Sequence, residues 1–398
     1  MIKNARKTVT RYFSRMKFLY DMRVHNISVQ IILALLLTVI FLWCVNNVYN
    51  NMEKSNLSLG IGFLSERAGF EIDQGIVPYT SDSSYATAIL VGFVNTFWLA
   101  FSGMIPATII GTLVGAGRLS ANKLVAWICR VYVEVFRNIP PLVVIFFLYK
   151  SVLSVLPIPD HSIVLPFGMF LNNRGLSFPT LTMDTNAKIF VFSFVLGIVL
   201  SLFATRLSRH FHEKTGKALP LLYISTFLIF GLPTLVLIAL KYQLHFDKPV
   251  LGQFNFIGGS TVSPEFMSLY IALSCYRAAF IAEIVRSGLI AVPRGQMEAA
   301  IALGLTHRKA TRLVLLPQAM RSIIPPLTSQ YLNLLKNSSL AVAVGFADLV
   351  SVGGTIINQT GQAIEIILIW MFIYLSLSIM IALFMNRLNA KIALKEKK

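Results

Sequence analysis

Long apolar segments alternate with short charged segments along most of this chain. Apolar runs of about twenty residues or more match the length of helix that crosses the hydrocarbon core of a bilayer. We expect such helices at about 27–48, 86–116, 124–156, 187–205, 219–240, 266–291, 322–345 and 363–386. The pattern therefore predicts an all-α integral membrane protein with about eight transmembrane helices.

The distribution of charge predicts how these helices are oriented. Residues 1–26 form a basic tail that contains Lys3, Arg6, Lys7, Arg11, Arg15, Lys17 and Arg23. In the loop at 49–85, acidic residues outnumber basic ones. Lys and Arg are roughly three times as frequent in the predicted inner segments as in the outer ones, which the positive-inside rule associates with the cytoplasm. We expect a multi-pass protein with both termini in the cytoplasm.

Composition supports the membrane class and excludes others. Hydrophobic residues make up 56% of the chain and charged residues 13%. The formal net charge of +18 would suit a nucleic acid, but the charges lie in short loops and tails instead of on one face. His210 and His212 occupy a predicted inner turn, and two histidines there are more typical of solvated residues than of a metal site. We therefore expect neither nucleic acid nor metal.

One charged stretch, at about 293–321, separates two very apolar segments. Because unpaired charges and open backbone are costly in hydrocarbon, we expect it to form a cytoplasmic hairpin of two short helices. Gly304 is predicted to end the first helix and Pro317 to break the second. The small side chains of Ala299 and Ala300 beside Glu298 favour a slim face that enters a groove on another protein.

The spacing within this stretch resembles the EAA loop of ABC-importer permeases. That loop reads Glu-Ala-Ala, three residues, Gly, nine residues, Ile or Val, one residue, Leu-Pro, and here Val314 occupies the branched position. The resemblance implies a type I ABC-importer permease core whose hairpin docks on a separate ATPase subunit. It assigns that coupling role to Glu298, Ala299, Ala300, Gly304 and Pro317.

Four other stretches resemble the polar amino-acid branch of these permeases: Gly92–Thr96, Tyr132–Leu142, Tyr276–Arg286 and Leu335–Leu340. Permeases of that branch usually have five spans. Here residues 27–85 would add a transmembrane helix and a periplasmic loop, and a helix pair at about 187–240 would be inserted in the permease domain at 86–390.

Sequences in the predicted outer loops are similar to those of the larger general L-amino-acid permeases of Gram-negative bacteria; they are Gly62–Phe70, Pro78–Ser83 and Leu171–Leu176. This resemblance implies import of L-amino acids with broad specificity across the bacterial inner membrane. It also implies three kinds of partner: a second, different permease, a pair of ATPase subunits and a periplasmic amino-acid-binding protein.

The chain lacks the glycine-rich phosphate loop of ATPases, because Gly216-Lys217 is followed by alanine and has no preceding glycine at the required spacing. We therefore expect no cofactor on this chain and no enzymatic activity, with ATP bound by the partner subunit.

Charged residues inside predicted spans are costly unless they pair or face a wet cavity. Arg277 and Lys336 have no acid on the same face nearby, so either could receive the carboxylate of an amino acid, with Asn337 and Ser338 on the ammonium side. Pairing of Arg277 with Glu134 or another acid across helices is an equal alternative. For Arg130–Glu134–Arg137 and Glu283–Arg286 we favour ion pairs within each helix, and we include Glu134 and Arg137 among the substrate-path residues.

Two other classes of protein compete with this interpretation. An ion-coupled secondary amino-acid transporter predicts inverted repeats and acids at the membrane midplane, and the sequence has no such duplication. A membrane-embedded enzyme would need a cluster of catalytic side chains within the spans, whereas all six histidines fall in tails or loops.

Overall fold

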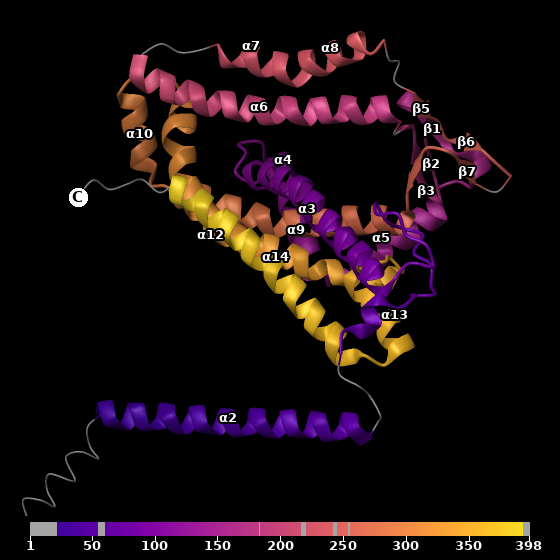
Figure 1. Ribbon diagram of the computed structural model, residues 1–398. Coiled ribbons are helices and arrows are strands. Elements are labelled where there is room, and N and C mark those ends of the chain that lie inside the picture. Colours follow the sequence, from indigo (N-terminus) through magenta and orange to yellow (C-terminus); the bar gives the residue numbers. More distant parts are fainter. Residues whose placement is uncertain are drawn as a thin grey trace, which may run out of the picture. The chain divides into compact units, whose positions relative to one another are not determined.

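The computed structural model describes residues 22–54, 60–182, 184–215, 220–241, 245–253 and 255–392 (Figure 1). Most of the basic tail at 1–26, residues 393–398, and the side chains of His210 and His212 lie outside the described part. The chain divides into two compact units. One comprises Met1–Glu66 with Thr355–Ile369, and the other comprises Arg67–Gly354 with Trp370–Lys398.

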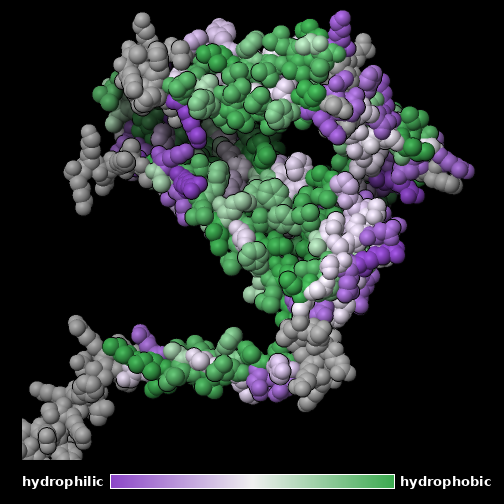
Figure 2. All heavy atoms as spheres, viewed as in Figure 1, coloured by the Kyte–Doolittle hydropathy of each residue, from purple (hydrophilic) through white to green (hydrophobic). Residues whose placement is uncertain are grey.

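In the first unit, helix α2 (Met22–Lys54) contains the first predicted span. Its residues 27–51 are exposed and mostly apolar, a surface that a soluble protein would bury and that suits a helix surrounded by lipid (Figure 2). The short helix η1 (Gly62–Ser65) follows, and Phe63 is its buried residue.

The second unit is built around the long helix α9 (Pro264–Ile290). Its neighbours are α3 (Tyr85–Gly117), α4 (Lys123–Asn138), α5 (Pro141–Val155) and α12 (Leu316–Asn337). Gly111 and Gly115 allow α3 to approach α9 closely. A Cβ atom at Gly115 would lie 2.6 Å from the carbonyl oxygen of Ala282. The glycine repeat thus serves helix packing, as is common in membranes.

Two spans are sharply bent. Helices α4 and α5 meet at 107° next to Pro140 and Pro141. Helix α12 continues as the 3₁₀ segment η6 (Ser338–Val344), and a break of 53° then precedes α13 (Leu349–Thr360). Gly345 supplies the left-handed conformation at this break, with φ +78°. The last helix is α14 (Ala363–Ile392).

The inserted pair consists of α6 (Thr185–Thr215) and a second arm made of α7 (Leu221–Thr226), the π turn η4 (Phe227–Gly231) and α8 (Leu232–Ala239). The two arms lie side by side in Figure 1 and are in contact. Among the described residues, five helices are long and apolar enough to cross a membrane, or up to seven if each bent pair is one span. The predicted span at 219–240 corresponds to a shorter apolar helix, Tyr223–Ala239.

A small sheet was not predicted and modifies the expectation of an all-α chain, although the fold is mostly helical. Four strands pair in the order β1-β2-β3-β8, all antiparallel. They are β1 (Ile163–Leu165), β2 (Met169–Asn172), β3 (Gly175–Phe178) and β8 (Ser260–Val262). The sheet joins the loops before and after the inserted pair, which are far apart in sequence.

Short elements complete this region. Two further strand pairs are β4 (Thr180–Leu181) with β5 (Phe246–Asp247), and β6 (Val250–Leu251) with β7 (Phe256–Ile257). The 3₁₀ turns η2 (Pro159–His161) and η3 (Pro166–Gly168) flank β1.

Candidate functional site

The charged stretch at 293–321 forms the predicted hairpin, and Gly304 ends its first helix as expected. Helix α10 (Arg294–Ala302) is followed by Gly304 in the left-handed conformation, with φ +83°. The N–H of Leu305 donates to the carbonyl of Ala300, and that of Gly304 donates to the carbonyl of Ile301. This pair of bonds is the Schellman arrangement, which requires a residue that tolerates positive φ.

The prediction that Pro317 breaks the second helix is wrong. Helix α11 (His307–Ala310) continues through the π turn η5 (Thr311–Leu315) directly into α12. The N–H of Leu316 donates to the carbonyl of Thr311, five residues back. The π turn ends just before Pro317 and widens the backbone there, so the helix accommodates the proline without a break. The second arm is therefore the end of a long helix and not a separate short one.

The two arms of the hairpin pack through small side chains. Ala300 is only 4% exposed, and Ala310 is buried as well. Gln318 Nε2 donates to Gln296 Oε1 at 3.4 Å and links the start of α12 to α10. The prediction that Ala300 contributes to an exposed slim face is therefore wrong, because its side chain is buried.

The outer surface of the hairpin is exposed and partly apolar. Glu298 and Ala299 are exposed as predicted. Leu303 is 84% exposed, and Ile301 and Leu313 are exposed as well. Large apolar side chains on a charged, water-facing loop are typical of a contact surface for another protein. The sequence signal for the exposure of Leu303 is its position next to Gly304, because few neighbouring side chains can pack against a residue at a tight turn.

Three arginines surround Glu283 on α9. Arg118, just after α3, and Arg286, at 2.6 Å, both pair with this carboxylate, and Arg137 of α4 lies 3.9 Å from it. The predicted Glu283–Arg286 pair is thus confirmed. The predicted pairs within α4 are wrong: among the described residues Glu134 makes no ion pair and is exposed.

Arg277 lies one turn and a half before Glu283 on α9 and is 7% exposed. Its Nη1 donates to Gln330 Oε1 at 3.3 Å and its Nη2 to the carbonyl of Asn333 at 3.5 Å. Its Nε has no hydrogen-bond partner among the described residues. The alternative that Arg277 pairs with Glu134 or another acid is wrong for the described part of the chain.

An aromatic ring connects two of the predicted substrate-path arginines. The guanidinium carbon of Arg277 lies 5.6 Å from the ring centre of Phe280, and that of Arg137 lies 5.7 Å from it. Such contacts stabilise a cation without neutralising it. Arg277 and Arg137 therefore belong to one region, at the junction of α4, α9 and α12.

Three other predicted substrate-path residues lie where α12 continues into η6. Lys336 is exposed and Asn337 half-buried, whereas Ser338 is buried and donates to the carbonyl of Leu335 within its own turn. Gln330 and Asn333, which contact Arg277, were missed. Their signal is a polar stripe on α12, because Gln330, Asn333 and Asn337 recur at helical spacing on one face.

Comparisons with known proteins show what this chain is similar to. Residues 107–394 match the family described as "Binding-protein-dependent transport system inner membrane component". The chain is 55% identical over 379 residues to the general L-amino acid transport system permease protein AapQ of Rhizobium johnstonii, covering 95% of each chain. It is 37% identical over 411 residues to the glutamate/glutamine/aspartate/asparagine transport system permease protein BztB of Rhodobacter capsulatus, covering 95% of this chain and 96% of that one.

A solved structure, of an amino acid ABC transporter with histidines, is similar at a TM-score of 0.46 and 20% identity. The similarity covers 77% of this chain and 95% of that one.

Proposed function

Because this chain belongs to the family of binding-protein-dependent transport system inner membrane components, we propose that it is the permease subunit of an ATP-driven importer of L-amino acids. The observation that carries the proposal is the 55% identity to a general L-amino acid permease across 95% of both chains. Identity at this level, spread over the entire length, supports broad specificity for L-amino acids. It also disfavours the alternative function, an ion-coupled secondary amino-acid transporter.

The orientation in the inner membrane rests on charge. The excess of Lys and Arg in alternate loops supports cytoplasmic termini and a cytoplasmic hairpin. The sheet and the loop at 67–84 then belong to the periplasmic side. We retain the division into a basic tail at 1–26, an added helix and loop at 27–85, and a permease domain at 86–390.

The hairpin is proposed as the coupling element between this chain and an ATPase subunit. Glu298, Ala299 and Leu303 form an exposed surface that a cleft on the partner can hold, with Gly304 setting the turn. Helix α11, η5 and α12 run without interruption from His307 to Asn337, a length of about 45 Å at 1.5 Å per residue. Movement of the hairpin would therefore be transmitted along this helix toward the break at Gly345. Pro317 with its π turn lies within it, as do Pro325 and Pro326.

The substrate path is proposed along the face shared by α9 and α12. Arg277 is a buried cation with long hydrogen bonds, and it forms no ion pair with an acidic residue in the described part of the chain. It can therefore receive a carboxylate at modest cost. Arg137 shares the ring of Phe280 and adds positive charge. Asn337, Ser338 and Lys336 extend the face along α12, and exposed Glu134 on α4 is a counter-charge for an ammonium group.

Three partners follow from the family and complete the proposal. They are a pair of ATPase subunits, a second permease distinct from this one, and a periplasmic amino-acid-binding protein. ATP would bind only to the ATPase partner, and this chain would hold no cofactor.

The proposal is tested by amino-acid uptake into proteoliposomes that contain this chain and its partners. Uptake should require internal ATP, and the double variant Glu298→Ala, Gly304→Val should abolish it. Uptake by this chain alone, driven by a proton or sodium gradient without ATP, would contradict the proposal.

A further inference from the structure

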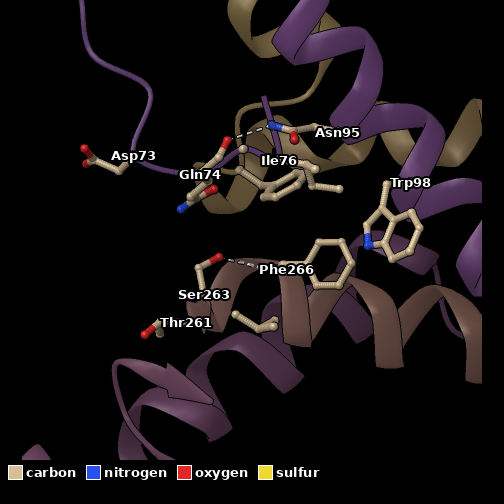
Figure 3. Close-up of a pocket in the computed structure, with 11 residues that line it drawn as sticks. Asp73, Gln74, Ile76, Asn95, Trp98, Thr261, Ser263 and Phe266 are labelled. Carbon is tan, nitrogen blue, oxygen red and sulfur yellow. Dashed lines mark hydrogen bonds between the residues drawn. The ribbon is translucent and has the colours of Figure 1, made fainter. Parts of the chain in front are cut away.

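A small pocket opens where four parts of the chain meet at the start of α9 (Figure 3). Its volume is about 190 Å³. The side chains of Gln74 and Ser263 face each other across the opening, and Trp98 and Phe266 form a wall. The full lining is Asp73, Gln74, Gly75, Ile76, Asn95, Trp98, Thr261, Val262, Ser263, Phe266 and Phe346.

Buried hydrogen bonds hold this pocket in shape. Asn95 is 4% exposed, and its Nδ2 donates to the carbonyls of Gln74 and Ala347, both at 2.8 Å. Gln74 Nε2 donates to Glu265 Oε2 at 3.0 Å, and the hydroxyl of Tyr149 donates to Glu265 Oε1 at 3.1 Å. The loop at 73–76 is thereby tied to α3, α5, α9 and the break before α13, so the pocket is preformed.

Several hydrogen-bond acceptors line the pocket, together with the indole N–H of Trp98. Gln74 directs its N–H group to Glu265, and its buried Oε1 has no hydrogen-bond partner in the described part of the chain. Asp73 adds an exposed carboxylate beside the opening, which Figure 3 shows turned outward, so it acts on a ligand as a nearby negative charge. None of the lining residues is Lys, Arg or His. An unsatisfied buried acceptor is costly, so this lining favours a ligand that donates hydrogen bonds and carries positive charge.

The apolar part of the lining fits the same kind of ligand. Trp98, Phe266 and Phe346 present aromatic rings, which attract cations through their faces. A nearby acid, the unpaired side-chain oxygen of Gln74 and aromatic rings are groups that suit an ammonium ion. The pocket is also distinct from the region of Arg277, where the side chains are cationic and suit a carboxylate.

We propose that this pocket binds the α-ammonium group of a free amino acid at the periplasmic mouth of the permease. The inference rests on the proposed function, because that function supplies the amino acid and the sidedness. Asp73 attracts the cation, Gln74 Oε1 accepts a hydrogen bond from it, and Trp98 covers it. The amino acid thus meets an acceptor-lined site first and the arginines of the transport path afterwards.

The test measures ligand binding to the assembled transporter in nanodiscs without the binding protein, by isothermal titration calorimetry. L-Leucine methyl ester keeps the ammonium group and lacks the carboxylate charge, whereas N-acetyl-L-leucine lacks the ammonium charge. We expect the ester to bind and the N-acetyl compound not to bind. The ester also avoids a contribution from Arg277, which would recognise a carboxylate.

Substitutions then locate the site. Asp73→Asn should weaken ester binding about threefold, the loss expected for an exposed charge near a cation. Trp98→Leu should weaken it about threefold, and Trp98→Phe should restore most of the affinity because the aromatic wall is kept. Glu71→Gln is the matched control, since it removes the same charge from the same exposed loop outside the pocket lining.

Equal ester affinity in the Asp73→Asn and Glu71→Gln variants would overturn the inference, as would equal binding of the N-acetyl compound. Loss of affinity for the binding protein in Asp73→Asn, without any ester binding to the wild-type complex, would make the pocket a protein-docking site and would also overturn it. ATP-driven uptake is measured on the same preparations. If the wild-type transporter takes up amino acids but Asp73→Asn binds the ester as well as the wild type does, only the pocket proposal is refuted. If the wild-type transporter shows no ATP-driven uptake, the proposed function is refuted.

Discussion

The guanidinium of Arg277 on α9 reaches the side-chain oxygen of Gln330 on α12 at 3.3 Å. The bond is long for a charge-assisted contact, and the arginine is buried. A cation held this loosely can exchange its neutral partner for an anion with little loss. The relationship therefore marks the α9–α12 face as the place where a carboxylate would be received.

Replacing Arg277 with methionine should raise the KM of ATP-driven amino-acid uptake about tenfold or more, because a charge-assisted hydrogen bond to the substrate is lost. Arg277→Lys should keep part of the affinity. Uptake kinetics in proteoliposomes measure the effect, with Arg174→Met, an exposed arginine on a strand turn, as the control. Unchanged uptake in Arg277→Met would remove this residue from the substrate path.

Leu303→Asp should weaken binding of the ATPase subunit on the order of tenfold, since an apolar anchor at the centre of a contact is replaced by a charge. The fold should be unaffected because Leu303 is 84% exposed. Co-purification of the ATPase with the permease measures the loss. Phe167→Ser, which removes another highly exposed apolar side chain from the sheet region, should have no effect on co-purification.

Gly304→Val should impair coupling, because a β-branched residue at φ +83° costs about 1–2 kcal/mol or more and would distort the hairpin turn. Gly304→Asn should be milder, since asparagine tolerates this conformation. The measurement is the number of amino acids imported per ATP hydrolysed. If Gly304→Val and Gly304→Asn coupled equally well, the left-handed turn would not matter for coupling.

Gly111→Leu should destabilise the transmembrane core by about 1–3 kcal/mol, the usual cost of overpacking. A Cβ at this position would lie 2.7 Å from the side chain of Ile281 on α9. Ala116→Leu on an exposed face of the same helix is the matched control. Thermal unfolding of the purified complex, followed by size-exclusion chromatography, should show a lower midpoint only for Gly111→Leu.

The mostly helical membrane fold and the hairpin were predictable because they depend on local signals. Hydrophobic length marks the spans, and Gly304 marks the end of α10 because its conformation is needed there. The prediction that Pro317 breaks the second helix was wrong because it assumed standard α-helical geometry around the proline. The wider π turn that precedes it removes the conflict, and no local sequence signal distinguishes that solution from a break.

Interactions between distant segments could not be predicted from spacing alone. Arg137 was expected to pair with Glu134 on its own helix, yet it lies near Glu283 because α4 crosses α9. The hydrogen bonds of Arg277 to Gln330 and of Asn95 to Ala347 likewise join residues more than fifty positions apart. Strands β3 and β8 pair across the inserted helices, a register that neither loop indicates by itself.

That pairing has a consequence for how the chain can be shortened. In the antiparallel ladder, Phe178 lies opposite Ser260, so the chain leaves the core and returns to it at adjacent points. A two-residue hairpin turn of the Asn-Gly kind spans such a gap between paired strands. Residues 179–259 could then be excised as a cassette, and the remaining chain would reconnect without moving α5 or α9. The inserted helix pair is thus joined to the core along the chain at the adjacent ends of strands β3 and β8.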